Sequence, residues 1–362
     1  MSIFDLLPPN IRRIHPYVPG KPVEEVERQL GLSAIKMASN ENPLGPSPLA
    51  LEAIRQHLAQ AHRYPIGDGF YLRRKLAERL AVSMEEIILG SGSTDIIELV
   101  ARTFLTSADD VITSRHSFVM YTLAVQEMNS LMIYVPLKHD TYDLDAILDA
   151  LTPRTKVIFL ANPNNPTGTM VKAAQIDQFL DRLPRHIILV LDEAYYEYVQ
   201  DFDYSHSLEY VRQKKHVIVL RTFSKIYGLA GLRMGYGIAH PDFITCLNKV
   251  RSPFNTTSVA QAAAFAALDD AEHVRRSIES NCAGYAQLTD GFDRLGIRFV
   301  PSVTNFVLVD IRRDSVEAYQ NLLKHGVIVR PLKSSGFSTA LRVTIGTQKE
   351  NETLIRALQE AM

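Results

Sequence analysis

Cysteine is scarce in this chain of 362 residues, which contains only Cys246 and Cys282. The two residues lie well apart and outside any C-x-x-C pattern, so the sequence argues against a disulfide framework, a zinc site and a redox pair. We therefore expect no metal site, and we interpret both cysteines as small core residues.

Charge of one sign is also lacking, because 39 basic residues stand against 40 acidic ones and the formal net charge is −1. Without a basic tract or an aromatic-interleaved stripe of lysine and arginine, nucleic acid is not expected as a partner. Residues 1–13 contain no long apolar stretch, and no later segment approaches the ~20 apolar residues of a membrane span. We expect a soluble cytoplasmic protein with no membrane partner.

Two nucleotide-binding loops are missing as well. The chain has no G-x-x-x-x-G-K-[ST] loop for a nucleoside triphosphate and no G-x-G-x-x-G after a strand for a dinucleotide. The apolar run that ends in Asp192 and Glu193 is therefore not expected to form the magnesium site of a nucleotide triphosphatase. A carboxylate at the end of a buried strand still needs a partner, because burying an unpaired charge is costly. For Asp192 that partner can be the protonated ring nitrogen of a pyridoxal cofactor.

The length of the chain favours two domains over one. Between residues 86 and 239, short apolar runs alternate with longer helical patterns, as in strands buried on both faces by crossover helices. This pattern predicts an α/β domain with a mostly parallel sheet, which we assign to residues 36–265. The expected strands are residues 87–89, 111–112, 132–135, 157–160, 187–191, 217–220 and 236–239.

The pattern changes after residue 260, which indicates a smaller α+β domain at residues 266–362. A long helical region from Gln261 to about Leu295 precedes the shorter runs, and the prolines of residues 1–35 predict an irregular N-terminal arm. The expected strands of the smaller domain are residues 305–309, 327–329 and 341–345.

Polar residues follow several of the large-domain strands, where ligands bind in parallel sheets. The turn before Ser93 and Thr94 opens a helical pattern whose free N–H groups suit a phosphate, although it also fits an ordinary N-cap. Phe118 follows another strand and can lie on a planar cofactor or belong to the core. Asn165 lies in a turn with two prolines that can aim its amide inward, or it is part of a plain turn.

The segment Thr222-Phe223-Ser224-Lys225 places one amine close to two hydroxyls, with Arg233 eight positions later. A lysine that forms a Schiff base must be partly desolvated, and the apolar neighbour Phe223 can supply that desolvation. Thr222, Ser224 and Arg233 could hold a phosphate. This is the chemistry of an aldehyde cofactor with a phosphate tail, whereas a lone lysine near an arginine would fit a surface loop.

Together these loops resemble the fold-type-I pyridoxal-phosphate-dependent aminotransferases, and within them the subgroup that acts on histidinol phosphate. The resemblance covers nearly the whole chain. It is carried by the segments His15–Tyr17, Ala38–Pro43, Arg63–Pro65, Asn162–Gly168, Asp192–Tyr195, Thr222–Arg233 and Leu341–Gly346.

The resemblance implies pyridoxal 5′-phosphate as cofactor, attached to Lys225, which then moves the proton between substrate and cofactor. It implies that Asp192 keeps the pyridine nitrogen protonated and that Asn165 and Tyr195 hydrogen-bond the phenolic oxygen. Phe118 would stack on the ring. The residues implied for the cofactor phosphate are Ser93, Thr94, Thr222, Ser224 and Arg233.

The resemblance also implies a homodimer with shared active sites, since Tyr64 matches a tyrosine that reaches the neighbouring subunit's cofactor. For the substrate it implies contacts from Tyr17, Asn40, Arg330 and Arg342. The expected reaction is reversible transamination between a small amino donor and a 2-oxo acid, namely L-histidinol phosphate and 2-oxoglutarate.

Three alternatives stay open at this point. An aromatic aminotransferase of the same fold could share the pocket, because apolar contacts discriminate poorly between imidazole and phenyl rings. A pyridoxal-phosphate-dependent decarboxylase would share the motifs but release carbon dioxide. A cofactor-binding regulator would need a fused helix-turn-helix segment, for which we see no room in the chain.

Overall fold

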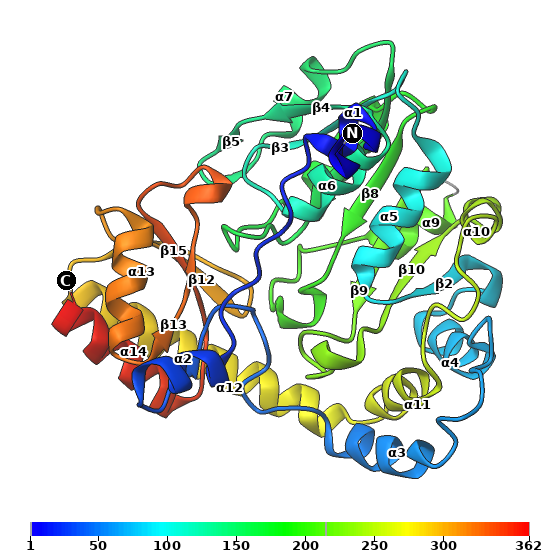
Figure 1. Ribbon diagram of the computed structural model, residues 1–362. Helices are drawn as coiled ribbons and strands as arrows, with labels where there is room; N and C mark the ends of the chain where they lie inside the picture. The colour runs from blue at the N-terminus through cyan, green and yellow to red at the C-terminus, as the bar shows by residue number, and fades with distance from the viewer. Residues whose placement is uncertain (1, 214–215, 362) are drawn as a thin grey trace.

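The computed structural model describes residues 2–213 and 216–361, which form a larger and a smaller lobe (Figure 1). Helix α12 (Ala271–Arg294) leads from one lobe to the other. Its first half, with Val274 and Ile278, packs against the core of the larger lobe, and its second half, with Leu288 and Phe292, belongs to the core of the smaller one. One helix therefore connects the two cores.

The larger lobe is built on a seven-stranded sheet in the order β2-β10-β9-β8-β7-β3-β4. All neighbouring strands are parallel except β10, which is antiparallel to both β2 and β9. The predicted α/β fold with a mostly parallel sheet is therefore confirmed. The strands are β2 (Ile87–Gly90), β3 (Asp110–Ser114), β4 (Leu131–Val135), β7 (Thr155–Ala161), β8 (Ile188–Asp192), β9 (Val217–Thr222) and β10 (Gly235–Ala239).

The continuous apolar runs of these strands are explained by burial on both faces. Strands β3, β8, β9 and β10 are buried at every position, whereas β4 lies at the sheet edge and is largely exposed. The helices of this lobe are α3 (Pro48–Leu58), α4 (Phe70–Leu80), α5 (Ser93–Phe104), α6 (Val119–Glu127), α7 (Leu144–Asp149), α8 (Ala173–Arg182), α9 (Ser207–Arg212), α10 (Pro241–Asn248) and α11 (Ser258–Ala267).

Short elements complete the larger lobe. A hairpin is formed by β5 (Leu137–Lys138) and β6 (Thr141–Tyr142), which pair antiparallel. The 3₁₀ turns are η2 (Met84–Glu86), η3 (Tyr196–Tyr198) and η4 (Ala230–Leu232).

The smaller lobe contains a four-stranded antiparallel sheet in the order β11-β12-β15-β14. Helices α13 (Ser315–Lys324) and α14 (Gln348–Ala361) pack with it, and β13 (Val327–Ile328) lies apart from it. A 3₁₀ turn, η5 (Lys333–Ser335), precedes the last strand. The strands of the sheet are β11 (Arg298–Val300), β12 (Phe306–Asp310), β14 (Arg330–Pro331) and β15 (Ala340–Thr344).

The helical region expected from Gln261 to Leu295 is two helices, α11 and α12, separated at residues 268–270. Asp270 caps the second helix, because its side chain accepts the N–H of His273 at 3.1 Å. An acidic residue in the middle of an apolar helical pattern thus marks a new helix start.

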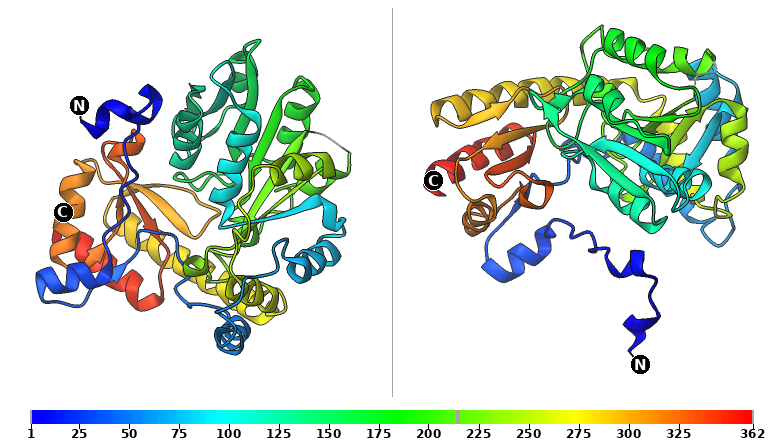
Figure 2. Two further views of the ribbon diagram at one scale, coloured as in Figure 1. Left: turned by 45° about the vertical axis from the view of Figure 1, so that its right-hand side comes forward. Right: turned by 90° about the horizontal axis from the view of Figure 1, so that it is seen from above.

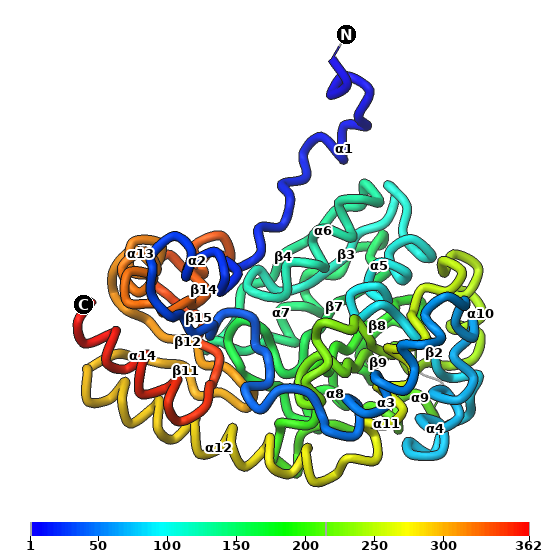
Figure 3. The backbone as a smooth tube through the Cα atoms, turned by 60° about the horizontal axis from the view of Figure 1, so that its bottom comes forward, coloured from blue at the N-terminus to red at the C-terminus, as the bar shows by residue number. Residues whose placement is uncertain are grey.

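The N-terminal segment is less irregular than expected. It contains η1 (Ile3–Leu6), α1 (Pro9–Arg12) and α2 (Val23–Leu30), followed by β1 (Ile35–Lys36), which pairs parallel with β13. The first residues project from the smaller lobe (Figures 2 and 3) and reach the larger one, where Asn10 Nδ2 donates to the carbonyl oxygens of Gln126 and Glu127 at 3.3 and 2.9 Å. Val26 belongs to the core of the smaller lobe. The domain boundaries at residues 35 and 265 stay predictions.

Neither of the two cysteines is fully buried. Cys246 is half-buried and Cys282 is exposed, so the prediction of two core cysteines is wrong. Among the described residues, no helix combines the length and apolar character needed to cross a bilayer.

Candidate active site

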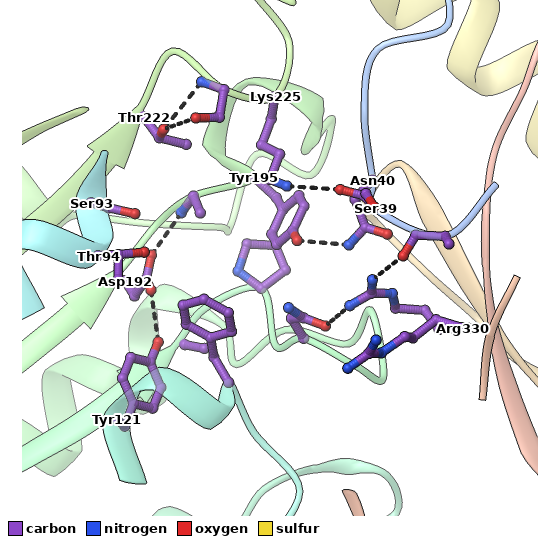
Figure 4. Close-up of a pocket in the computed structure, with 18 of the residues that line it drawn as sticks. Ser39, Asn40, Ser93, Thr94, Tyr121, Asp192, Tyr195, Thr222, Lys225 and Arg330 are labelled. Atoms are coloured by element: carbon purple, nitrogen blue, oxygen red, sulfur yellow. Dashed lines mark hydrogen bonds between the residues drawn. The ribbon is translucent and has the colours of Figure 1, made fainter. Parts of the chain in front are cut away.

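The main pocket lies at the strand ends of the large sheet, and residues of both lobes line it (Figure 4). The strand register brings these ends together, because Asp192 of β8 is level with Ala161 of β7, and Thr222 of β9 is level with Gly235 of β10. Every predicted site residue except Tyr64 lines this pocket. These residues are Tyr17, Asn40, Ser93, Thr94, Phe118, Asn165, Asp192, Tyr195, Thr222, Ser224, Lys225, Arg233, Arg330 and Arg342.

Lys225 enters the pocket three residues after the end of β9 (Figure 4). Its neighbours Phe223 and Ile226 are fully buried, as the sequence indicated. Burial, followed by the nearby charge of Arg342, lowers the pKa of the Lys225 amine to about 8. The Nζ atom donates a single 3.3 Å hydrogen bond, to the carbonyl of Ser39. Roughly a tenth of the amine is thus neutral at pH 7, far more than for an ordinary lysine, and the neutral amine is the nucleophile.

Asp192 lies at the end of β8 and is buried. Its Oδ1 accepts the N–H of Ala194 at 3.1 Å and its Oδ2 accepts the hydroxyl of Tyr121 at 2.7 Å. Burial raises the pKa of Asp192 to about 6, and these two hydrogen bonds oppose that rise. The carboxylate is poised to receive a cationic N–H partner.

Tyr121 is a pocket residue that the sequence analysis missed. It lies on α6, three positions after Phe118, and both side chains line the pocket. Residues three apart lie on one face of a helix, so this spacing was the available signal. By itself the spacing does not distinguish Tyr121 from an ordinary core tyrosine.

The expected phosphate cup lies where helix α5 begins. Ser93 and Thr94 form the first turn of α5, whose N-terminal N–H groups and helix dipole favour an anion. Opposite them, Thr222 Oγ1 lies 3.0 Å from Ser224 Oγ, and Arg233 Nη1 lies 3.4 Å from the same Ser224 oxygen. Hydroxyls, N–H groups and a guanidinium thus converge on one corner of the pocket.

Gly92 shapes this corner. Its φ is +79°, in the region that glycine adopts without strain. A Cβ atom at this position would lie 2.6 Å from Nη2 of Arg233, so the arginine can lie against the helix start only because residue 92 has no side chain.

A hydrogen-bonded chain lines the other end of the pocket. Asn40 Nδ2 donates to the hydroxyl of Tyr195 at 2.8 Å, and Arg342 donates at 2.6 Å to Asn165 Oδ1 and at 2.6 Å to the carbonyl of Ala38. The Nε of Arg342 is buried and has no hydrogen-bond partner among the described residues. An unsatisfied buried donor of this kind indicates that a ligand oxygen completes the site.

Arg330 and Tyr17 lie beside Arg342. Arg330 faces Arg342 directly across the β14–β15 pairing, and its guanidinium lies 5.3 Å from the centre of the half-exposed Tyr17 ring. Its Nη1 donates to the carbonyl of Val18 at 2.9 Å. Asp192 and Arg330 enter the pocket from opposite sides in Figure 4.

Tyr64 lies outside this pocket. Its side chain is 83% exposed and stacks on Phe254 with ring centres 4.7 Å apart. It lines a separate, more apolar hollow with Ile66, Tyr71 and Phe265. Within one chain, Tyr64 therefore does not contribute to the site.

The residues present fit pyridoxal 5′-phosphate. The donors around Gly92 suit its phosphate, Asp192 suits its ring nitrogen, and Lys225 suits its aldehyde. Phe118 and Tyr195 line the walls between these groups. The amine and the carboxylate have pKa values moved toward neutrality, as is common in catalytic sites.

Comparison with known proteins agrees with this chemistry. The family model for aminotransferases of class I and II matches residues 33–358. A histidinol-phosphate aminotransferase of Moorella thermoacetica is 49% identical over 354 residues, covering 97% of this chain and 92% of that protein. Histidinol-phosphate aminotransferase 1 of Nitrosococcus oceani is 46% identical over 360 residues, covering 99% and 97%.

Among solved structures, the histidinol-phosphate aminotransferase of Sinorhizobium meliloti in complex with pyridoxal-5′-phosphate superposes with a TM-score of 0.92 at 30% identity. The match covers 99% of this chain and 98% of that one. The family depends on pyridoxal phosphate, which confirms the cofactor expected from the sequence. The chain belongs to the class I and II aminotransferases and is a pyridoxal-phosphate-dependent enzyme of fold type I.

Proposed function

We propose that the chain transaminates L-histidinol phosphate with 2-oxoglutarate, a step of histidine biosynthesis. The observation that carries this proposal is the pair Arg330 and Arg342, which are directly opposite on neighbouring strands and both line the pocket. In the described part of the chain, both guanidinium groups donate only to neutral oxygens, those of Val18, Ala38 and Asn165.

Two like charges in such a cross-strand pair repel each other, so an anionic ligand stabilises them. A phosphate monoester carries a charge of about −1.5 to −2 at neutral pH and can engage both guanidinium groups, whereas a carboxylate carries one charge. Pairing with a phosphorylated amine therefore accounts for Arg330, which a plain amino acid would leave without a partner. The names of the Moorella and Nitrosococcus relatives support the same substrate.

Each residue of the pocket has a separate role in this reaction. Bound pyridoxal phosphate supplies the aldehyde that accepts the amino group and a protonated ring that disperses negative charge. Lys225 would take the proton from the substrate Cα and return it to C4′ of the cofactor. Asp192 would hold the proton on the ring nitrogen, and Asn165 and Tyr195 would donate hydrogen bonds to the phenolic oxygen.

We further propose a homodimer in which Tyr64 reaches the partner's cofactor phosphate. The exposed ring of Tyr64 and the apolar hollow around it support a protein contact on this face. A cytoplasmic location, expected from the sequence, is part of the same proposal and is tested by cell fractionation.

The substrate is tested by single-turnover rates with histidinol phosphate, glutamate and phenylalanine, in the wild type and in Arg330→Ala. Truncating one partner of a buried charged pair costs roughly 2–5 kcal/mol, and Arg330 is half-buried, so the specificity constant kcat/KM for histidinol phosphate should fall by a smaller factor, about tenfold or more. Phenylalanine should be little affected. Arg298→Ala, on an exposed edge of the same lobe, is the matched control.

Equal losses on both substrates, or a wild-type preference for phenylalanine, would move the assignment to an aromatic aminotransferase. Carbon dioxide release during turnover would move it to a decarboxylase.

A further inference from the structure

Tyr121 is held rigidly beneath Asp192. Its ring is fully buried and stacks on Phe159 with centres 4.8 Å apart and planes 7° apart, while Phe118 packs edge-on at 5.7 Å. These contacts leave the hydroxyl aimed at Asp192 Oδ2, to which it donates at 2.7 Å (Figure 4).

We propose that Tyr121 is a positioning residue that keeps Asp192 ionised and thereby keeps the shared proton on the cofactor's ring nitrogen. The proposal rests on the role proposed for Asp192. One proton lies between the carboxylate and the ring nitrogen, and it can reside on either. A phenol that donates to the carboxylate stabilises the ionised carboxylate, so it shifts the proton to the nitrogen. No bond other than this N–H or O–H bond changes.

The surroundings of Asp192 make the Tyr121 donor important. The carboxylate is buried, and the N–H of Ala194 is its other hydrogen-bond donor in the described chain. Lys225 is the cation that acts on it from the pocket side, and Glu193 lies next to it in the chain. The charge of Glu193 is balanced by Arg221, whose Nη2 is 2.9 Å away. Removing Tyr121 would therefore leave few groups to stabilise the charge.

Tyr121 itself stays protonated. Burial, followed by the charge of Asp192, raises the pKa of its hydroxyl well above the usual value. The phenol therefore acts as a fixed donor throughout the working pH range and does not compete for the shared proton.

The test uses the enzyme reconstituted with pyridoxal phosphate labelled with ¹⁵N in the ring, whose ¹⁵N chemical shift reports where the proton resides. Tyr121→Phe keeps the ring contacts and removes the hydroxyl. Loss of a hydrogen bond to a charged group should shift the proton equilibrium toward the carboxylate roughly tenfold or more. The ¹⁵N signal should move toward that of Asp192→Asn, which marks the unprotonated ring.

A matched control is available in Tyr210→Phe. Tyr210 is also buried and donates to Asp177 at 2.7 Å, but it lies outside the pocket, so its loss should leave the ¹⁵N signal unchanged. An unmoved signal in Tyr121→Phe, with a moved one in Asp192→Asn, would overturn the proposal for Tyr121 alone. An unmoved signal in Asp192→Asn would instead overturn the role of Asp192.

If the Tyr121→Phe protein does not fold, a second variant provides the test. A fluorotyrosine introduced at position 121 is a stronger donor with nearly the same shape, so the ¹⁵N signal should move toward the fully protonated value. A shift in the opposite direction would contradict the proposal.

Discussion

Asn40 and Tyr195 are joined by a 2.8 Å hydrogen bond from the amide Nδ2 to the phenol oxygen. Asn40 is itself anchored by the smaller lobe, because its Oδ1 accepts the hydroxyl of Thr344 at 3.2 Å and its carbonyl accepts Nδ2 of Asn305 at 3.0 Å. The amide thus has partners at both ends. Asn40 lines the pocket, where the sequence suggested a substrate contact, and its hydrogen bond also places it to orient Tyr195.

Asn40→Gly tests this role. The φ of Asn40 is +56°, which glycine adopts without strain, so the variant removes the amide and keeps the backbone. Tyr195 should then donate less well to the phenolic oxygen of the cofactor, and the absorbance titration of the bound cofactor should move to higher pH by roughly 0.5–1 unit. A raised KM with an unchanged titration would mean that Asn40 acts as a substrate contact alone.

The pKa of Lys225 predicts the pH dependence of cofactor attachment. Only the neutral amine attacks the aldehyde, and the neutral fraction grows as the pH rises through the pKa of about 8. The attachment rate measured by stopped-flow absorbance on the cofactor-free protein should therefore rise with a midpoint of about 8. Borohydride reduction and peptide mapping should find the adduct on Lys225, and a label elsewhere would rule out this assignment.

Arg342 should influence that midpoint, because its positive charge helps to lower the pKa of Lys225. In Arg342→Gln the midpoint should move to higher pH, and in the exposed-surface control Arg55→Gln it should not. If both variants keep the wild-type midpoint, burial alone sets the pKa of Lys225.

The raised pKa of Asp192 predicts how the stability of the cofactor-free protein depends on pH. The pKa of Asp192 is about 6 in the folded chain and about 3.9 when unfolded, so the folded state binds the proton more tightly. The free energy of unfolding should then fall by up to about 3 kcal/mol as the pH rises from about 4 to about 6. Asp192→Asn has no carboxyl group to titrate, so its free energy of unfolding should not fall in this way. The stability of the variant relative to the wild type should therefore increase across the same pH range. Parallel curves from urea titrations would contradict the assignment.

Much of the site could be predicted because its residues lie in short local patterns at strand ends. Apolar runs locate the strands, and polar residues directly after them, such as Asp192 and Lys225, must converge once the strands are parallel. The direction of β10 could not be predicted, because an apolar run has the same composition in either direction. Its reversal brings Gly235 level with Thr222 at the pocket.

Tyr121, which the sequence analysis missed, and the hydrogen-bond partners of Asn40 depend on contacts between distant parts of the chain. Asn40 meets partners 155 and 304 residues away, and Tyr121 meets Asp192 after 71 residues. Neither residue differs locally from an ordinary turn asparagine or core tyrosine. Their hydrogen bonds follow from the packing of the two lobes, which a single sequence does not specify.

Tyr64 provides a test of the proposed shared site. Lys225→Ala and Tyr64→Ala subunits should each form impaired homodimers, whereas a mixed dimer contains one site with both Lys225 and the other subunit's Tyr64 intact. Mixing the two variants through mild denaturation and refolding should therefore restore activity. As a control for changes to this surface, the Lys225→Ala subunit can be mixed with Tyr71→Ala, which alters the same hollow, in place of Tyr64→Ala. If hybrids form without recovery, Tyr64 does not complete the partner's site.

The close approach of Gly92 and Arg233 predicts a cofactor-binding defect that arises from one added methyl group. In Gly92→Ala the Cβ would lie 2.6 Å from Arg233 Nη2, so the guanidinium, at the end of a flexible side chain, must shift from its position beside Ser224. The cost in pyridoxal phosphate affinity should be about 1.5–3 kcal/mol, as for a lost hydrogen bond to a charged group. The backbone of residue 92, with φ +79° and ψ 168°, lies in a region essentially confined to glycine, so an alanine there adds roughly 1–3 kcal/mol of strain to the folded protein.

Gly31→Ala separates these two effects. Gly31 has φ +68° and ψ 22°, in the left-handed helical region, and no atom within 4 Å of its added Cβ, so this variant carries a smaller backbone strain and no clash. Equilibrium binding of pyridoxal phosphate, measured by fluorescence quenching, should weaken about tenfold or more in Gly92→Ala and stay unchanged in Gly31→Ala. Both should lose unfolding free energy as cofactor-free proteins, and Gly92→Ala should lose more, because its backbone region is the less accessible of the two to alanine. Equal affinities in the two variants would mean that Arg233 does not hold the cofactor phosphate.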